Sequence, residues 1–194
     1  AEIASVLRVW RERIDGIGSR SGIAYVNVFK NSGYEAGTSL VHSHSQVMAM
    51  NVVPTEINEA VAARNRFVAC PHCKIVDIER QGARRCFEND AYVAFTPYAS
   101  RFNYEVWVFP KAHSTSMGNI DELADIVQRV LVKINRMKWS YNISVHYAPH
   151  GTDLHFHVEI CPRIAIWGGF EIGSGVTING VSPEDAAAFY RGER

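Results

Sequence analysis

The stretch VHSHSQ, residues 41–46, decides the fold, because the stretch LHFHVE, residues 154–159, repeats its His-x-His pattern later in the chain. Alternate residues of a strand point to the same face. If strands cover 42–53 and 153–160, each pattern places two imidazoles beside a third polar group, an amide in the first copy and a carboxylate in the second. Imidazoles so placed can hold a metal ion, react with a substrate, or merely hydrogen-bond on a half-buried strand.

The two patterns end similar series of elements, in which a helix, a strand and a loop precede the His-x-His strand. The second copy is also preceded by two further strands and the motif CPHC, for which the first copy has no counterpart. We therefore predict the C-terminal portion of one repeat over residues 1–66 and a complete repeat over residues 67–194. Hydrophobic periodicity predicts helices over 2–15, 56–67, 121–136 and 182–191, and further strands over 24–29, 92–97, 104–110 and 142–148.

The composition excludes several classes of protein. The 194 residues carry 20 acidic and 20 basic side chains without a long run of one sign, which argues against a nucleic-acid surface or a membrane-surface helix. No apolar run is long enough to span a membrane, and the N-terminal segment is amphipathic rather than signal-like. The 4 cysteines do not resemble the disulfide framework of a small secreted protein. We expect a cytoplasmic protein that binds neither nucleic acid nor membranes.

Four side chains predict a metal site. Cys70 and Cys73 form a C-x-x-C motif, His113 follows a predicted strand, and His155 opens the second His-x-His pattern. A Cys2His2 set suits tetrahedral zinc, and the zinc would be structural because no coordination position stays open. The alternatives are a redox pair, which would favour a thioredoxin-like context that the sequence does not predict, or two inert thiols. We expect His72, inside the motif, to point outward, and His146 and His150 to be surface or hydrogen-bonding residues.

The first copy offers groups that suit a phosphate. In the preceding loop, NSGYEAGTS, Gly33 and Gly37 allow tight turns in which backbone N–H groups approach an anion, and Ser39 adds a hydroxyl. A neutral imidazole at His44 is a nucleophile toward phosphorus, and the phosphoramidate that it forms is labile enough to pass the group on. Gln46 can donate to a phosphoryl oxygen that an ionised glutamate would repel. We therefore predict that the first copy is catalytic and that the second is a degenerate copy kept for its metal.

The joint pattern resembles the galactose-1-phosphate uridylyltransferases, the transferase branch of the histidine-triad superfamily. The resemblance rests on HSHSQ preceded by NSGYEAGTS, and it extends through FPKAH and LHFHVE to the tail GGFEIGSGVTINGVSPEDAAAFYR. It implies an α+β fold with a histidine-triad-like antiparallel sheet and flanking helices. It also implies ping-pong transfer of a nucleotidyl group through a covalent histidine intermediate, with UDP-hexose and hexose-1-phosphate as substrates.

The resemblance also implies roles for individual residues. His44 matches the nucleophile that becomes uridylylated, and Gln46 matches the glutamine that holds the transferred phosphoryl group. His42 matches a metal ligand of the first repeat. The implied substrate-binding residues lie in the loop and in the tail, where an aromatic–glutamate pair contacts the hexose: Asn31, Gly37, Ser39, Phe170 and Glu171. In this family the tail loop serves the partner subunit's site, so a homodimer is implied.

The chain departs from the family pattern in its first repeat, which has no C-x-x-C motif of its own and thus no cysteine partners for His42. A preceding segment or a companion chain is expected to supply them, unless that metal site is absent. The leading hypothesis is transfer of UMP from UDP-glucose to galactose-1-phosphate. The alternatives are a phosphorylase or adenylyltransferase of the same branch, acting on ADP-glucose or a dinucleotide, and a zinc-stabilised binding module without catalytic activity.

Overall fold

The computed structural model describes residues 2–40 and 42–193. Seven strands form one antiparallel sheet in the order β2-β1-β6-β7-β5-β4-β3. The strands are β1 Tyr25–Ser32, β2 Gln46–Met50, β3 Arg85–Glu88, β4 Tyr92–Phe95, β5 Val106–Pro110, β6 Tyr141–His146 and β7 His157–Pro162. The helices are α1 Glu2–Gly18, α2 Thr55–Arg64, α3 Pro71–Gln81, α4 Ile120–Arg136, α5 Gly169–Ser174 and α6 Pro183–Arg191, with a 3-10 turn η1 at Tyr34–Ala36. The predicted α+β class, an antiparallel sheet with flanking helices, is confirmed.

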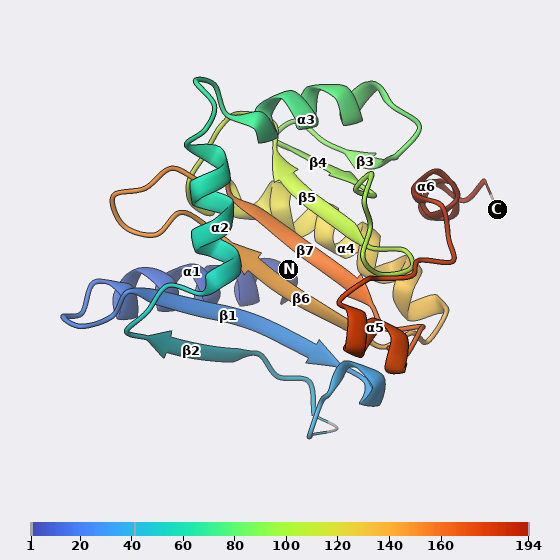
Figure 1. Cartoon of the computed structure of the whole chain (residues 1–194), viewed down its shortest axis with the longest axis horizontal. Coiled ribbons are helices and arrows are strands. Elements are labelled where there is room, and N and C mark those ends of the chain that lie inside the picture. The colour runs from blue at the N-terminus through green and yellow to red at the C-terminus, as the bar shows by residue number, and fades with distance from the viewer. Residues whose placement is uncertain (1, 41, 194) are drawn as a thin grey trace.

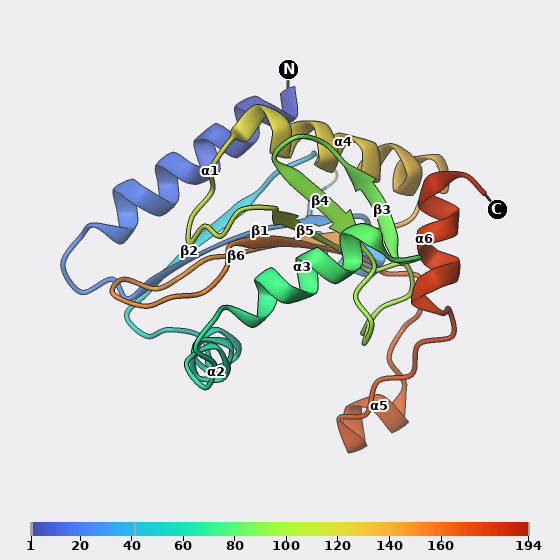
Figure 2. The same ribbon diagram turned by 90° about the horizontal axis from the view of Figure 1, so that it is seen from above.

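The helices cover the sheet in two layers (Figures 1 and 2). Figure 2 shows α1 and α4 side by side on one face, with α2, α3 and α5 on the opposite face and α6 beside the β3 end of the sheet. Figure 1 shows β2 at one edge of the sheet and α2 crossing in front of the strands. The layer of α2 and α3 carries the CPHC motif, whereas the α1–α4 layer encloses the larger core.

The main core lies between the sheet and the α1–α4 layer. Apolar residues recur along α4 at helical spacing, so Leu123, Val127 and Ile134 are all buried. Asn119 caps this helix by accepting a hydrogen bond from the backbone N–H of Glu122. Burying each such side chain contributes about 1.5–3 kcal/mol. The strands supply the facing side of the core: Val26, Val28, Val106, Val108, Val158 and Ile160.

The two His-x-His segments lead into equivalent hairpins that meet at the centre of the sheet. Phe29 of β1 lies opposite Gln46 of β2, and Ser144 of β6 lies opposite Glu159 of β7. Phe29 and Ser144 also lie opposite each other, because β1 and β6 pair antiparallel. The register therefore relates the hairpins by a local two-fold axis that exchanges Gln46 with Glu159. One difference remains, because β7 pairs with β5 on its other side whereas β2 is an edge strand.

The predicted strands over 42–53 and 153–160 are too long at their N-terminal ends. β2 begins only at Gln46 and β7 only at His157. The shared face is nevertheless confirmed for the second copy, because His155 and His157 both pack against Phe109 and His157 lies 3.6 Å from Glu159. It is not confirmed for the first copy, where His42 and His44 both precede β2. The sequence also does not predict β3 or α5, because a 4-residue strand and a 6-residue helix are too short to show a clear period.

The remaining predicted elements agree with the structure, although their ends differ by a few residues. The segment that begins within CPHC forms a further helix, α3, which the predicted helices do not include. Ser182 caps α6 by accepting from the N–H of Asp185, and Pro183 occupies the first turn. Across residues 2–40 and 42–193, no helix is both long and apolar enough to cross a membrane.

Candidate active site and metal centre

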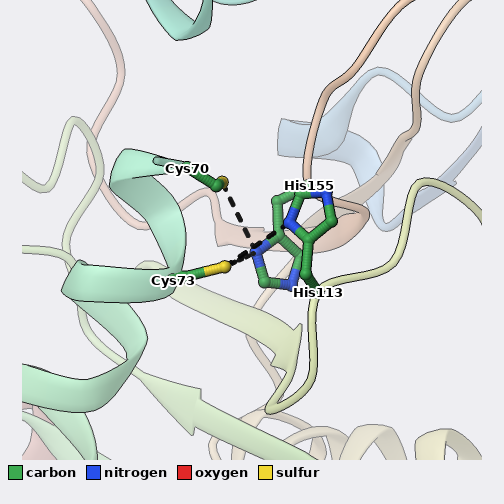
Figure 3. Close-up of side chains that lie close together, drawn as sticks. All are labelled: Cys70, Cys73, His113 and His155. Atoms are coloured by element: carbon green, nitrogen blue, oxygen red, sulfur yellow. Dashed lines mark hydrogen bonds between the residues drawn. The ribbon is translucent and has the colours of Figure 1, made fainter. Parts of the chain in front are cut away.

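The predicted Cys2His2 set converges in the structure (Figure 3). Cys70 precedes α3, Cys73 lies in its first turn, His113 follows β5 and His155 precedes β7. The four ligand atoms lie within 4.8 Å of one another. Cys73 Sγ lies 3.4 Å from His113 Nδ1 and 3.6 Å from His155 Nδ1, and Cys70 Sγ lies 3.9 Å from His155 Nδ1. Tetrahedral zinc would place sulfur and nitrogen ligands about 3.5 Å apart. The side chains therefore fit this ion.

Hydrogen bonds fix which nitrogen each histidine presents. His113 donates from Nε2 to Asp153 Oδ1 over 2.8 Å, and His155 donates from Nε2 to the carbonyl oxygen of Pro110 over 3.1 Å. Each oxygen accepts a hydrogen bond from Nε2–H. Each neutral imidazole therefore keeps its lone pair on Nδ1, the nitrogen that faces the cysteines. Asp153 is itself held by Arg64 of α2, whose Nε lies 2.9 Å from Oδ2.

Burial sets the protonation of this cluster. Burial lowers the pKa of His155 to about 4, so its imidazole stays neutral, which is the form that binds metals. Burial and the neighbouring Cys70 raise the pKa of the Cys73 thiol to about 11. The thiolate form of Cys73 therefore needs a nearby cation to offset its charge. Asp77 and Asp153 raise the Cys73 pKa further.

His44 lies in the short segment between the glycine loop and β2. Its Nδ1 lies 2.9 Å from the carbonyl oxygen of His42. A carbonyl only accepts, so Nδ1 carries the proton and Nε2 keeps the lone pair that a nucleophile needs. His44 lines a cavity of about 580 Å³ between α1, α4 and the end of the sheet. His42 lies instead on a neighbouring cavity of about 450 Å³, with Asn31 and Ser39.

The glycine loop is fixed by residues at the start of β6. Gly33 and Gly37 have φ of +89° and +78°, a region that favours glycine. A Cβ at Gly33 would overlap the Ser140 hydroxyl, which donates to the Glu35 carboxylate. Asn142 donates from its amide to Asn31 Oδ1 over 2.8 Å and to the Ala36 carbonyl over 2.9 Å. Asn142 of β6, with Ser140 just before that strand, therefore holds the loop that carries the predicted substrate-binding residues.

The second copy surrounds its histidine with charge. His157 Nδ1 lies 3.0 Å from the His155 carbonyl oxygen, the same contact that His44 makes. Its Nε2 lies 3.6 Å from Glu159, whose carboxylate accepts from Arg101 over 2.7 Å. Burial alone would raise the pKa of Glu159, but His157, His146 and Arg101 lower it to about 2. The carboxylate is therefore ionised at neutral pH.

The structure separates several residues that the sequence groups together. Gln46 is exposed in β2 and does not line the cavity of His44. His42 lies outside the Cys/His cluster. Phe170 and Glu171 lie in α5, on the sheet face opposite α1 and α4, where Glu171 accepts from the N–H of Gly168. Within the described residues they touch neither cavity beside the His44 segment.

Two expectations about isolated histidines are wrong. His72 does not point outward, because its ring packs 5.4 Å from Phe109 and 5.8 Å from His157 between ring centres. His146 is not a surface residue, because it stacks on His157 with ring centres 4.7 Å apart, and its buried Nε2 has no hydrogen-bond partner among the described residues. Both rings pack beside His157, on the same face of the sheet. Four further residues contact the sites but could not be found from the sequence, because single polar residues carry no motif: Lys30, Arg64, Arg101 and Asp153.

A family described as "Domain of unknown function (DUF4921)" matches residues 14–188. The chain belongs to this family. ADP-glucose phosphorylase of Arabidopsis thaliana is 31% identical over 97% of this chain and 58% of its own length. Galactose-1-phosphate uridylyltransferase of Thermotoga maritima is 27% identical over 96% of this chain and 65% of its own length. The chain therefore spans less than two thirds of these relatives.

Solved structures of similar proteins share this fold. The crystal structure of the Arabidopsis thaliana ADP-glucose phosphorylase with bound ADP-glucose gives a TM-score of 0.87 at 30% identity, over 97% of this chain and 66% of that one. A uridylyltransferase structure gives a TM-score of 0.89 at 26% identity, over 98% of this chain and 68% of that one. The resemblance to the uridylyltransferases and their histidine-triad-like fold is thereby confirmed, and it extends to ADP-glucose phosphorylase.

Proposed function

We propose that this DUF4921 chain carries the nucleophile of a nucleotidyltransferase that acts on nucleoside-diphosphate sugars. The proposal rests on the tautomer of His44. Its Nδ1–H donates a hydrogen bond to the His42 carbonyl, so the neutral ring keeps a lone pair on Nε2, and the residue lines a cavity. Relatives named as a uridylyltransferase and as an ADP-glucose phosphorylase support the same chemistry. The loop fixed by Asn142 would hold the phosphates through Asn31, Gly37 and Ser39.

The proposed reaction has two balanced steps. His44 Nε2 attacks the phosphorus of the nucleotide, and a nitrogen–phosphorus bond forms while the bond to the hexose-1-phosphate oxygen breaks. The hexose-1-phosphate leaves with that electron pair. A phosphate oxygen of the acceptor then attacks the same phosphorus, and the electron pair of the nitrogen–phosphorus bond returns to the imidazole. Gln46 lies two residues after His44, at the start of β2. It would hold the transferred phosphoryl group of a substrate that contacts both residues.

The leading donor is UDP-glucose, with galactose-1-phosphate as the acceptor. A specific observation favours a second candidate, ADP-glucose with inorganic phosphate as the acceptor, because the Arabidopsis thaliana ADP-glucose phosphorylase is similar along 97% of the chain. The two candidates use one nucleophile and differ in base and acceptor.

We further propose a homodimer, in which Phe170 and Glu171 of one subunit would contact the hexose at the other subunit's site. A companion chain or a preceding segment would lie along the edge strand β2.

We also propose that Cys70, Cys73, His113 and His155 hold a zinc ion. The four ligand atoms leave no position for substrate, so the ion would stabilise the fold by linking α3 to the ends of β5 and β7. The zinc ion would take no part in the reaction at His44. The remaining predicted ligand, His42, would require partners from outside the described residues.

Intact-mass measurement tests the proposed activity. The full chain is incubated with UDP-glucose or with ADP-glucose, and its mass is recorded before and after. A uridylyl adduct that disappears on addition of galactose-1-phosphate supports the uridylyltransferase. An adenylyl adduct that disappears on addition of inorganic phosphate supports the phosphorylase. No adduct with either donor, in a chain that retains its fold, would contradict the proposed function and favour a binding module.

A further inference from the structure

The backbone ladder between β1 and β2 ends just before the His44 segment. Phe29 and Gln46 form the last pair, so Lys30, the next residue of β1, has no backbone partner in β2. Its side chain takes over this role. Lys30 Nζ donates to Ser43 Oγ over 2.6 Å and to the carbonyl oxygen of His44 over 3.1 Å. One ammonium group therefore connects the rigid strand to the segment that carries the imidazole.

Lys30 also stands apart in charge. It is the only lysine or arginine between Ser21 and Ala63 in the sequence. Among the described residues that line the cavity of His44 or the neighbouring cavity of Asn31, it is the only lysine or arginine, and it lines both. Burial lowers its pKa, which means that the ammonium is partly desolvated and depends on the two oxygen atoms that it contacts.

We propose that Lys30 is the positioning residue of the His44 nucleophile. This inference rests on the proposed function and adds a residue that its motif does not contain. The imidazole is anchored through Nδ1 to the His42 carbonyl, but that contact lies within the same short segment and cannot fix the segment relative to the sheet. The contacts from Lys30 to Ser43 and to the His44 carbonyl do fix the segment relative to the sheet, because Lys30 belongs to β1. Lys30 thereby places Nε2 at the cavity without touching the reacting phosphorus.

Three variants separate positioning from other roles. Lys30→Met keeps the aliphatic stem and removes the donors, Lys30→Arg keeps a charged donor, and Ser43→Ala removes one of the two contacts. The rate of adduct formation is measured by quenched mass spectrometry over a range of UDP-glucose and ADP-glucose concentrations. For Lys30→Met we expect the saturating rate to fall about 100-fold, the cost of misplacing a reacting group by roughly 1 Å. The half-saturating donor concentration should change less than about 3-fold, because uniform substrate binding is not lost.

The other two variants calibrate this result. Lys30→Arg should recover most of the rate, and Ser43→Ala should lower it less than Lys30→Met does, because the bond to the His44 carbonyl remains. An unchanged saturating rate in Lys30→Met would overturn the proposal. So would a higher half-saturating concentration at an unchanged saturating rate, because that result would make Lys30 a substrate-binding residue instead.

A second measurement does not need the activity. Diethyl pyrocarbonate modifies unprotonated imidazole nitrogens, and peptide mass mapping gives its rate at His44. Releasing the segment in Lys30→Met should raise this rate at least about 3-fold, while circular dichroism stays that of the folded chain. If the unsubstituted chain forms no nucleotidyl adduct, the proposed function fails. The reagent still tests whether Lys30 positions His44. An equal His44 reactivity in both proteins would then overturn the positioning role by itself.

Discussion

The two His-x-His copies share a backbone arrangement and differ in what surrounds the second imidazole. His44 and His157 both direct Nδ1 at the carbonyl oxygen two residues earlier. His44 lines a cavity, and its printed ring contact involves Nδ1 alone, whereas Nε2 of His157 lies 3.6 Å from the ionised Glu159. An anionic phosphate would be repelled from the second copy but not from the first. The shared contact therefore directs Nδ1 to the backbone in both copies, and the neighbouring groups decide whether the other nitrogen meets a carboxylate.

The largest expected effect separates the two histidines by substitution. His44→Ala should lower adduct formation by at least about 10³-fold, because no other described group replaces the lost nucleophile. His157→Ala should retain the adduct within about 10-fold. Both rates are measured by intact mass with UDP-glucose and ADP-glucose, below the melting temperature of each variant. His157→Ala removes a ring stacked on Phe109 and His146, so its stability is recorded separately. An adduct on His157 in the unsubstituted chain would reverse the comparison.

The next effect concerns the metal that the second copy is proposed to bind. Cys73→Ser should abolish stoichiometric zinc and lower the free energy of unfolding by roughly 4 kcal/mol, the size of loss expected when a structural metal is removed. The melting temperature should fall by roughly 10 °C. His42→Ala is the matched control from the first copy, because His42 lies outside the cluster, and its zinc content should not change. Equal zinc content in Cys73→Ser, by elemental analysis, would remove this cysteine from the ligand set.

The fold and the Cys/His cluster could be predicted from the sequence for identifiable reasons. Helical periods such as that of α4 extend over 17 residues, and the C-x-x-C pair with two histidines offers the ligand types of tetrahedral zinc, although the long spacing to the histidines is weakly specific. The directions of the imidazoles could not be predicted, because they depend on contacts distant in sequence. His155 turns to the cysteines through its bond to Pro110, and the loop of Asn31 is held by Asn142. No local pattern records which backbone group will lie beside a given side chain.

A smaller effect tests the burial of the second copy through acid stability. Burial, followed by the charge of His157, lowers the pKa of His146 to about 4 from an ordinary 6.5. A group with a lowered pKa in the folded state stabilises the fold above its unfolded pKa and loses that contribution as pH falls. The chain should therefore lose roughly 2–3 kcal/mol between about pH 6.5 and pH 4 through this residue. In His146→Gln, urea unfolding across that range should show a flatter dependence, and an unchanged slope would contradict the assignment.

The smallest effect concerns Asp153, which supports the metal site without touching the metal. Asp153→Asn replaces a charged acceptor of the His113 proton with a neutral one, and so weakens the preference for a lone pair on Nδ1. Zinc affinity, measured by competition with a chromogenic chelator, should fall about 10-fold. This is the low end of such effects, because Asp153 is partly exposed and water can replace part of the bond. Asp121→Asn, which breaks only the exposed pair with Arg8, should leave the affinity unchanged. If both variants bind zinc equally well, the Pro110 carbonyl and the cysteines suffice to orient the cluster, and the acid on His113 serves only to hold α2 through Arg64.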